Sequence, residues 1–240
     1  MRSSGYTWRA RIAPATLAVL PLATLYFYRT VALSQFAVPT MLIAIAGVVA
    51  AELVRGAGRR LEPRLVRAWG GMPTTHRLRA SAGDDDLRRA VAAVTGESLP
   101  SARDERRGGN AADDRIVAVV RALIVVIRND GPDADLLHRE NMSYGFWRNS
   151  LALKPLAIVV LVAAVLAQVL GFIWLAVPQS TSVRIFVAFL DVALLCYWTI
   201  AVSRGRVRRQ GEIYADRLFV AANARSRMVQ QRHLRGRAER

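Results

Sequence analysis

The chain has 240 residues, of which 53% are hydrophobic and 22% charged, and its formal net charge at pH 7 is +16. A mean hydropathy of +0.22 beside that much charge excludes an ordinary soluble globule, unless apolar and charged residues occupy separate segments. The single cysteine, Cys196, excludes an intrachain disulfide framework and a cysteine-based zinc site. The composition therefore predicts apolar spans joined by basic connections.

Arginine supplies nearly all of the basic charge, since Lys154 is the only lysine among the 34 Lys and Arg residues. An isoelectric point near 11.4 is also typical of some nucleic-acid-binding proteins. Arginines that flank membrane spans accumulate on the cytoplasmic side, however, and we favour this explanation. We therefore expect the lipid bilayer as a partner and do not expect nucleic acid.

Four apolar stretches have the character of membrane spans. The stretch from Lys154 to Val177 carries no charge after its first residue and exceeds the ~20 residues that cross a hydrocarbon core. Ile12–Tyr28 resembles a signal peptide, but it ends in aromatic residues where cleavage needs small ones, so we predict an uncleaved span. Phe36–Val54 and Ile185–Val202 complete two hairpins with short turns.

The distribution of arginines sets the predicted orientation. Residues 1–11 hold 3 arginines, residues 55–150 hold 17 and residues 204–240 hold 11, whereas each hairpin turn holds one. Positive charge marks the cytoplasmic side, so both termini and the middle region are expected there. The predicted protein is all-α and multi-pass, in a bacterial inner membrane. Its segments are a cytoplasmic N-terminus (1–11), a transmembrane hairpin (12–54), a cytoplasmic domain (55–150), a second hairpin (151–203) and a basic cytoplasmic tail (204–240).

The middle region reads as helical. Asp84–Asp86 ahead of an apolar run predicts a capped short helix, and Gly96–Gly109 predicts a loop. Asp113–Asn129 predicts a helix, although its Val and Ile content also suits a strand. Asp133–Asn149 predicts another helix, and Glu212–Arg240 a helix that follows a break at Gly211. The helix predicted over Asp113–Asn129 is expected to bury one face, which consists of Ile116, Val119, Val120, Leu123 and Ile127.

The stretch from Trp69 to Arg79 is an unusual loop. Two glycines and a proline favour a structural turn, after which threonines could cap the next element. The alternative is a cradle of backbone amides for a phosphate-bearing ligand, although the spacing is not that of a P-loop. The candidate contact residues are Gly70, Gly71, Pro73 and Thr74, with Arg77 and Arg79 as ligand or headgroup contacts.

A second polar stretch, 141–149, lies just ahead of the third span. Its aromatic residues and arginine suit simple anchoring at the membrane interface. The sharper hypothesis is a polar contact with the loop around Gly70, which would couple the cytoplasmic domain to the spans. The residues proposed for it are Asn141, Tyr144, Arg148 and Asn149, and Arg148 is also a candidate for headgroup contact.

Apart from Glu52, which lies two residues before the end of Phe36–Val54, Asp191 is the one acid inside a predicted span. Such residues are costly in lipid and raise the hypothesis of an ion path, a proton path or a polar helix contact. Its expected partner is Gln168 in the third span or a residue of a neighbouring subunit. Pairing with Arg184, two turns away on the same helix, is an equal alternative.

No catalytic set, metal site or cofactor motif stands out. His76, His138 and His233 are scattered, and a solvated helix cap explains Asp84–Asp86 better than a metal site does. We therefore predict a protein that is not an enzyme, with no cofactor and no metal.

Two motifs carry a resemblance to a known family. Residues 69–79 fit WGGxPTTxxLR and residues 140–149 fit ENxxYGFxRN, a pattern that resembles a family of bacterial four-span membrane proteins without an assigned activity. The resemblance implies an architecture and no chemistry. Two hairpins around a cytosolic insert are also similar to predicted pore-forming effectors of antiphage systems, a likeness of architecture only.

The leading functional hypothesis is a non-enzymatic membrane sensor or effector, in its strongest form a pore, with a cytoplasmic domain that receives a signal or a protein partner. A conducting form is expected to be a homo-oligomer. One alternative is a membrane-tethered scaffold or complex subunit that uses the arginine-rich tail. The last is a membrane enzyme acting on lipids, for which only residues 141–149 offer candidates.

Overall fold

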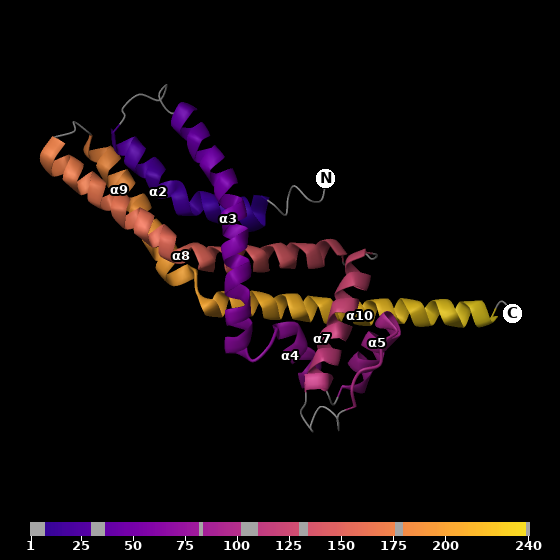
Figure 1. Cartoon of the computed structure of the whole chain (residues 1–240). Helices are drawn as coiled ribbons and strands as arrows, with labels where there is room; N and C mark the ends of the chain where they lie inside the picture. Colours follow the sequence, from indigo (N-terminus) through magenta and orange to yellow (C-terminus); the bar gives the residue numbers. More distant parts are fainter. Residues whose placement is uncertain are drawn as a thin grey trace. The chain divides into compact units, whose positions relative to one another are not determined.

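The computed structural model describes residues 8–29, 37–81, 84–101, 110–129, 134–175 and 180–238 (Figure 1). Within these ranges every regular element is helical and no strand occurs, so the predicted all-α class is confirmed. The chain divides into two compact units. The first unit comprises residues 1–65 and 142–207, and the second unit comprises residues 66–141 and 208–240.

The first unit contains the apolar helices. They are η1 (Trp8–Ile12), α2 (Ala13–Arg29), the first part of α3 (Ala37–Trp69), the later part of α8 (Ala134–Leu175), α9 (Thr181–Cys196) and η3 (Tyr197–Ala201). Ser180 caps α9, because its hydroxyl accepts from the Val183 amide at 3.3 Å. The later part of α8 and α9 run side by side (Figure 1).

The apolar part of α8 and the run formed by α9 and η3 each bury only a narrow stripe of side chains. From Leu153 on, the buried positions of α8 are Leu153, Ala157, Leu161, Ala164 and Gln168. In α9 and η3 they are Val187, Asp191, Leu194 and Trp198. Spacings of three and four residues are those of a helix pair that meets along one seam.

Apolar side chains cover the remaining faces of α8 and α9 and are exposed, for example Val159 at 65% and Phe189 at 68%. Residues 134–173 and 181–201 form two helices that are long and apolar enough to cross a membrane. In the most apolar 18-residue stretch of each helix only 22% of the residues are buried, whereas the core helix of a soluble protein is mostly buried.

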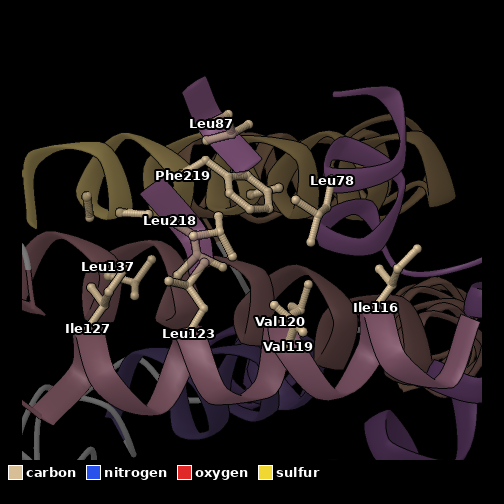
Figure 2. Close-up of a cluster of buried hydrophobic side chains, with 14 residues drawn as sticks. Leu78, Leu87, Ile116, Val119, Val120, Leu123, Ile127, Leu137, Leu218 and Phe219 are labelled. Atoms are coloured by element: carbon tan, nitrogen blue, oxygen red, sulfur yellow. The ribbon is translucent and has the colours of Figure 1, made fainter. Parts of the chain in front are cut away.

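The second unit has a conventional hydrophobic core. Its helices are α4 (Pro73–Ala80), α5 (Asp85–Thr95), α7 (Asn110–Asn129) and α10 (Arg204–Ala238, from Arg208 on), with the end of α3 and the start of α8. The predicted face of α7 is buried and points toward Leu218 and Phe219 of α10 (Figure 2). Leu78 of α4 and Leu87 of α5 join the same cluster.

Short-range signals explain where the helices of the second unit begin and end. The Asp84 carboxylate accepts from the Leu87 amide at 3.0 Å, which confirms the predicted capped helix, and α5 ends at Gly96 with φ +72°. The turn after α3 has φ +73° at Gly70 and +140° at Gly71. A side chain at either position would be strained, so this structural turn depends on glycine.

Helix boundaries differ from the prediction in one respect. The predicted break at Gly211 is wrong, because α10 is continuous from Arg204 to Ala238 and Gly211 is buried within it. A glycine costs a helix only about 1 kcal/mol, which the buried side chains that follow outweigh. The helix instead starts after Ser203, whose hydroxyl accepts from the Arg206 amide at 3.3 Å. Residues 30–36, 102–109 and 176–179, which hold parts of the predicted turns and loop, lie outside the described residues.

Candidate functional site

A half-buried carboxylate joins α3 to α8 ahead of the apolar part of α8. Arg148 Nη1 lies 2.7 Å from Glu62 Oε2, and the Tyr144 hydroxyl donates to Glu62 Oε1 at 3.1 Å. The Arg148 side chain is 14% exposed and that of Glu62 is 28% exposed. Because both carboxylate oxygens are engaged and the pair is only partly exposed, this contact fixes the two helices more firmly than a fully exposed ion pair would.

The positions of Tyr144 and Arg148 follow from helix geometry, since residues four apart share a face of α8. Burial, with the neighbouring Glu62 carboxylate, raises the pKa of Tyr144, which lies ten residues before Lys154. The phenol therefore stays protonated and keeps its role as a donor. Sequence reasoning missed Glu62; the available signal was that it is the only acid between Arg55 and Arg79.

Asn149 marks a close approach of α3 and α8. Its Nδ2 donates to the Ala10 carbonyl at 2.6 Å, while its Oδ1 faces Gly58. A Cβ atom built at Gly58 would overlap Asn149 Oδ1, so a larger residue there would have to displace the Asn149 side chain from its bond to Ala10. Three segments of the first unit thus meet at one amide side chain.

Lys154 has a specific structural role. Its ammonium group donates to the carbonyls of Thr199 at 3.0 Å and Val202 at 2.8 Å. These carbonyls lie at and beyond the end of η3, where helical partners run out. The lysine therefore caps the end of the helical run formed by α9 and η3.

A polar cluster lies on the buried stripes of the apolar helices. Thr24 Oγ1 of α2 is 3.0 Å from Asp191 Oδ1, 3.4 Å from Gln168 Nε2 and 2.8 Å from the Pro21 carbonyl oxygen. Asp191 is 6% exposed, and its Oδ2 is buried without a hydrogen-bond partner in the described chain. The structure thus brings the predicted Asp191 and Gln168 together through Thr24.

The alternative partner predicted for Asp191 makes a different contact. The Arg184 guanidinium lies over the Phe172 ring, 4.6 Å from its centroid. Thr24 was not among the predicted residues. The role of Thr24 depends on the packing of α2 against α9, which the sequence alone does not show.

The loop around Gly70 belongs to the second unit and its polar groups have local partners. Gly70 N–H donates to the Arg67 carbonyl at 3.1 Å and Gly71 N–H to the Val66 carbonyl at 2.9 Å. These two amides are therefore not available to cradle a phosphate. Pro73 and Thr74 are buried in the first turn of α4, whose cap position is Met72, so the threonines do not cap that helix.

The two predicted ligand arginines of this loop are paired with acids. Arg77 Nε lies 3.1 Å from Asp216 Oδ1, and Arg79 pairs with Asp113. A cavity of about 420 Å³ opens beside this loop, within the second unit. Its charged and polar lining consists of His76, Arg77, Arg208, Glu212 and Asp216. Cationic and acidic side chains alternate there, so the cavity has no net preference for an anion.

The predicted residues therefore fall into local groups. Tyr144, Arg148 and Asn149 find partners within the first unit, while Asn141 is half-buried in the second unit's part of α8. The hypothesis that residues 141–149 contact the Gly70 loop stays a prediction. Among the residues that the structure describes, no group of three or more His, Cys, Asp or Glu side chains could hold a metal ion.

Comparisons with family models, with curated proteins and with solved structures find no match for this chain. The candidate site therefore rests on its own geometry. It comprises the Glu62–Tyr144–Arg148 contact, the Lys154 cap and the Thr24–Gln168–Asp191 cluster.

Proposed function

We propose that this chain is a non-enzymatic effector of the bacterial inner membrane, in which the first unit forms four spans as two hairpins and the second unit lies in the cytoplasm. The observation that carries the proposal is a contrast between the two units. The apolar helices of the first unit expose apolar side chains, whereas the second unit has its own hydrophobic core and a cavity. Apolar surface of that extent suits lipid and not water. The resemblance in residues 69–79 and 140–149 agrees with this architecture.

In this proposal the second unit receives a signal or a protein partner, and the first unit responds by permeabilising the membrane. Asp191 is the residue that would line or gate the path, because it is the one acid on the buried stripe of α9. Three or four helices around a closely packed seam leave little room for ions, so conduction would require a homo-oligomer.

Membrane potential tests the proposal. The full chain is expressed at increasing levels in a bacterial host, and a potential-sensitive dye is read against the amount of protein in the membrane fraction. We expect depolarisation that grows with expression and that Asp191→Asn reduces, whereas Phe189→Leu on the exposed face of α9 leaves it unchanged. An unchanged potential at high membrane levels would refute the effector function.

A scaffold is the second candidate, and the long arginine-rich α10 favours it. Its residues Ala215, Leu218, Phe219, Ala221 and Ala222 belong to the core of the second unit, so deleting Glu212–Arg240 would damage that core. Reversing the charge of exposed Arg217 and Arg227 is the cleaner test. Loss of a co-purifying protein, together with an unaltered membrane potential, would favour the scaffold.

A further inference from the structure

We propose that the Thr24–Gln168–Asp191 cluster is a proton-binding site, in which the Asp191 carboxyl is neutral and is reached from the lipid through a groove between α8 and α9. The inference rests on the proposed placement of the first unit in the membrane. It does not require that the protein conducts ions. Its ligand is the proton, and its chemistry is that of a carboxylic acid in an apolar setting.

The hydrogen-bonding capacity of Thr24 supports the neutral form. A threonine hydroxyl has one proton to donate and two lone pairs to accept. If Asp191 carries a proton, it donates to Thr24 at 3.0 Å, Gln168 donates to Thr24 at 3.4 Å, and Thr24 donates to the Pro21 carbonyl at 2.8 Å. Each of the three contacts then has one donor and one acceptor.

If Asp191 is ionised, the same three hydrogen bonds cannot all form. The Asp191 carboxylate and the Pro21 carbonyl would then compete for the single Thr24 proton. Asp191 Oδ2 is buried and has no donor among the described side chains. Thr24 and Gln168 are the neutral side chains available to an Asp191 carboxylate. A carboxylate with so few donors in an apolar environment is expensive enough that the group takes up a proton instead.

Among the described residues, the side chains that contact Asp191 are not cations. By sequence, residues 13–25 of α2, 155–175 of α8 and 37–51 of α3 contain no ionisable side chain. On α9 the other ionisable groups are Cys196 and Arg184, and the Arg184 guanidinium lies over Phe172. The described partners of Asp191 are therefore polar and neutral.

A groove of about 410 Å³ gives access to the carboxyl from the side of the helix pair. Asp191 and Gln168 contribute the polar part of its wall. The rest is apolar and comes from both helices: Leu161, Val162, Val165, Leu166, Val169, Ala188, Val192 and Leu195. An apolar reagent dissolved in lipid can therefore approach Asp191 while a charged one is excluded.

Labelling with a hydrophobic carbodiimide tests the site. A protonated carboxyl adds across one C=N bond of the reagent, its proton moves to the nitrogen, and an oxygen-to-nitrogen acyl shift gives a stable N-acylurea that retains every atom of the reagent. At pH 7 an ordinary aspartate is protonated in fewer than about one molecule in 500, so we expect Asp191 to react on the order of a hundredfold faster than surface acids such as Asp84–Asp86.

The experiment uses the full chain in native membranes, with mass spectrometry of the modified peptide. We expect one reagent mass at Asp191 and none in Asp191→Asn, while a water-soluble carbodiimide with a charged amine modifies Asp84–Asp86 and not Asp191. An asparagine can reproduce the donor and acceptor of a neutral acid, so the variant should keep the thermal midpoint of the native chain in detergent.

Labelling of Asp191 no faster than of surface acids, in protein that sediments with membranes, would overturn the inference even if the membrane depolarises. Fast labelling without depolarisation would instead refute the effector function and leave the proton site standing. A chain absent from the membrane fraction would refute both. Should Asp191→Asn fail to accumulate, the rates measured on the native chain still decide the question.

Discussion

Both units bury apolar side chains, but they differ in what they expose. In the second unit Leu78, Leu123 and Leu218 are fully buried, and arginines and acids lie outside. In the first unit Val159 and Phe189 are exposed, and the buried stripes combine apolar side chains with the polar Gln168 and Asp191. Both units are helical, so secondary structure alone does not separate them. In the proposed placement, this difference in what each helix exposes reflects two solvents, lipid for the first unit and water for the second.

The largest expected effect concerns the core of the second unit. Leu123→Ala removes a fully buried side chain of α7 and should lower the free energy of unfolding of this unit by about 2–5 kcal/mol. The matched control is Val159→Ala in the first unit, an exposed position that should change stability by less than about 0.5 kcal/mol. Amide hydrogen exchange in α7 and α8 reports the two units separately. Equal losses would remove the contrast between them.

A matched pair of arginine substitutions tests directly whether lipid or water surrounds each helix. Val162→Arg places a charge near the middle of the apolar part of α8 and should oppose insertion by roughly 3 kcal/mol. Val125→Arg at an equally exposed position of α7 should be nearly neutral. The fraction of each variant that resists alkaline carbonate washing is the measurement. A Val162→Arg chain that inserts as well as Val125→Arg would argue against lipid around α8.

The buried contact between α3 and α8 should matter more than a surface ion pair. Glu62→Gln leaves Arg148 without its counter-charge and should destabilise the first unit by about 1–3 kcal/mol. Arg148→Met should cost a similar amount. A double-mutant cycle read from thermal unfolding in detergent gives the coupling energy, and a value near zero would show that the contact is incidental.

Two glycines of α3 offer a contrast within one helix. Gly58→Ala drives a methyl group into Asn149 and should destabilise the first unit by about 1–3 kcal/mol. A Cβ atom at Gly56 would have open space within 4 Å, so Gly56→Ala should stabilise the helix by about 0.5–1 kcal/mol. Thermal midpoints in detergent should move in opposite directions. A shift of the same sign for both would contradict the close approach of α3 and α8.

The smallest expected effect concerns the Lys154 cap. Lys154→Met leaves the Thr199 and Val202 carbonyls without this donor and should cost about 1 kcal/mol. Lys154→Arg retains the charge and should recover part of that loss. Faster amide exchange at the end of η3 in Lys154→Met is the local signature, and unchanged exchange would show that the cap contributes nothing.

Much of the helical architecture could be predicted from the sequence. Apolar run lengths located the helices, and the spacing from Ile116 to Ile127 identified the buried face of α7, because these signals are local. The continuity of α10 through Gly211 could not be predicted, since it depends on Leu218 and Phe219 packing into a distant core.

The candidate site shows the same limit. Asp191 and Gln168 could be predicted because a polar residue within an apolar run is recognisable from the sequence alone. Thr24 and Glu62 did not, because their roles arise only when α2 meets α9 and α3 meets α8. The close approach at Gly58 was also invisible, since it depends on where Asn149 lies in space.

The central claim is that the first unit lies in the membrane and the second unit lies in the cytoplasm. One measurement tests it most directly: a fluorescent protein that matures only in the cytoplasm is inserted between Gly108 and Gly109 of the full chain, and fluorescence is followed through ultracentrifugation. We predict fluorescence that sediments with membranes and is released only by detergent. A fluorescent supernatant without detergent, or a membrane-bound chain whose reporter stays dark because it has crossed the membrane, would contradict the account.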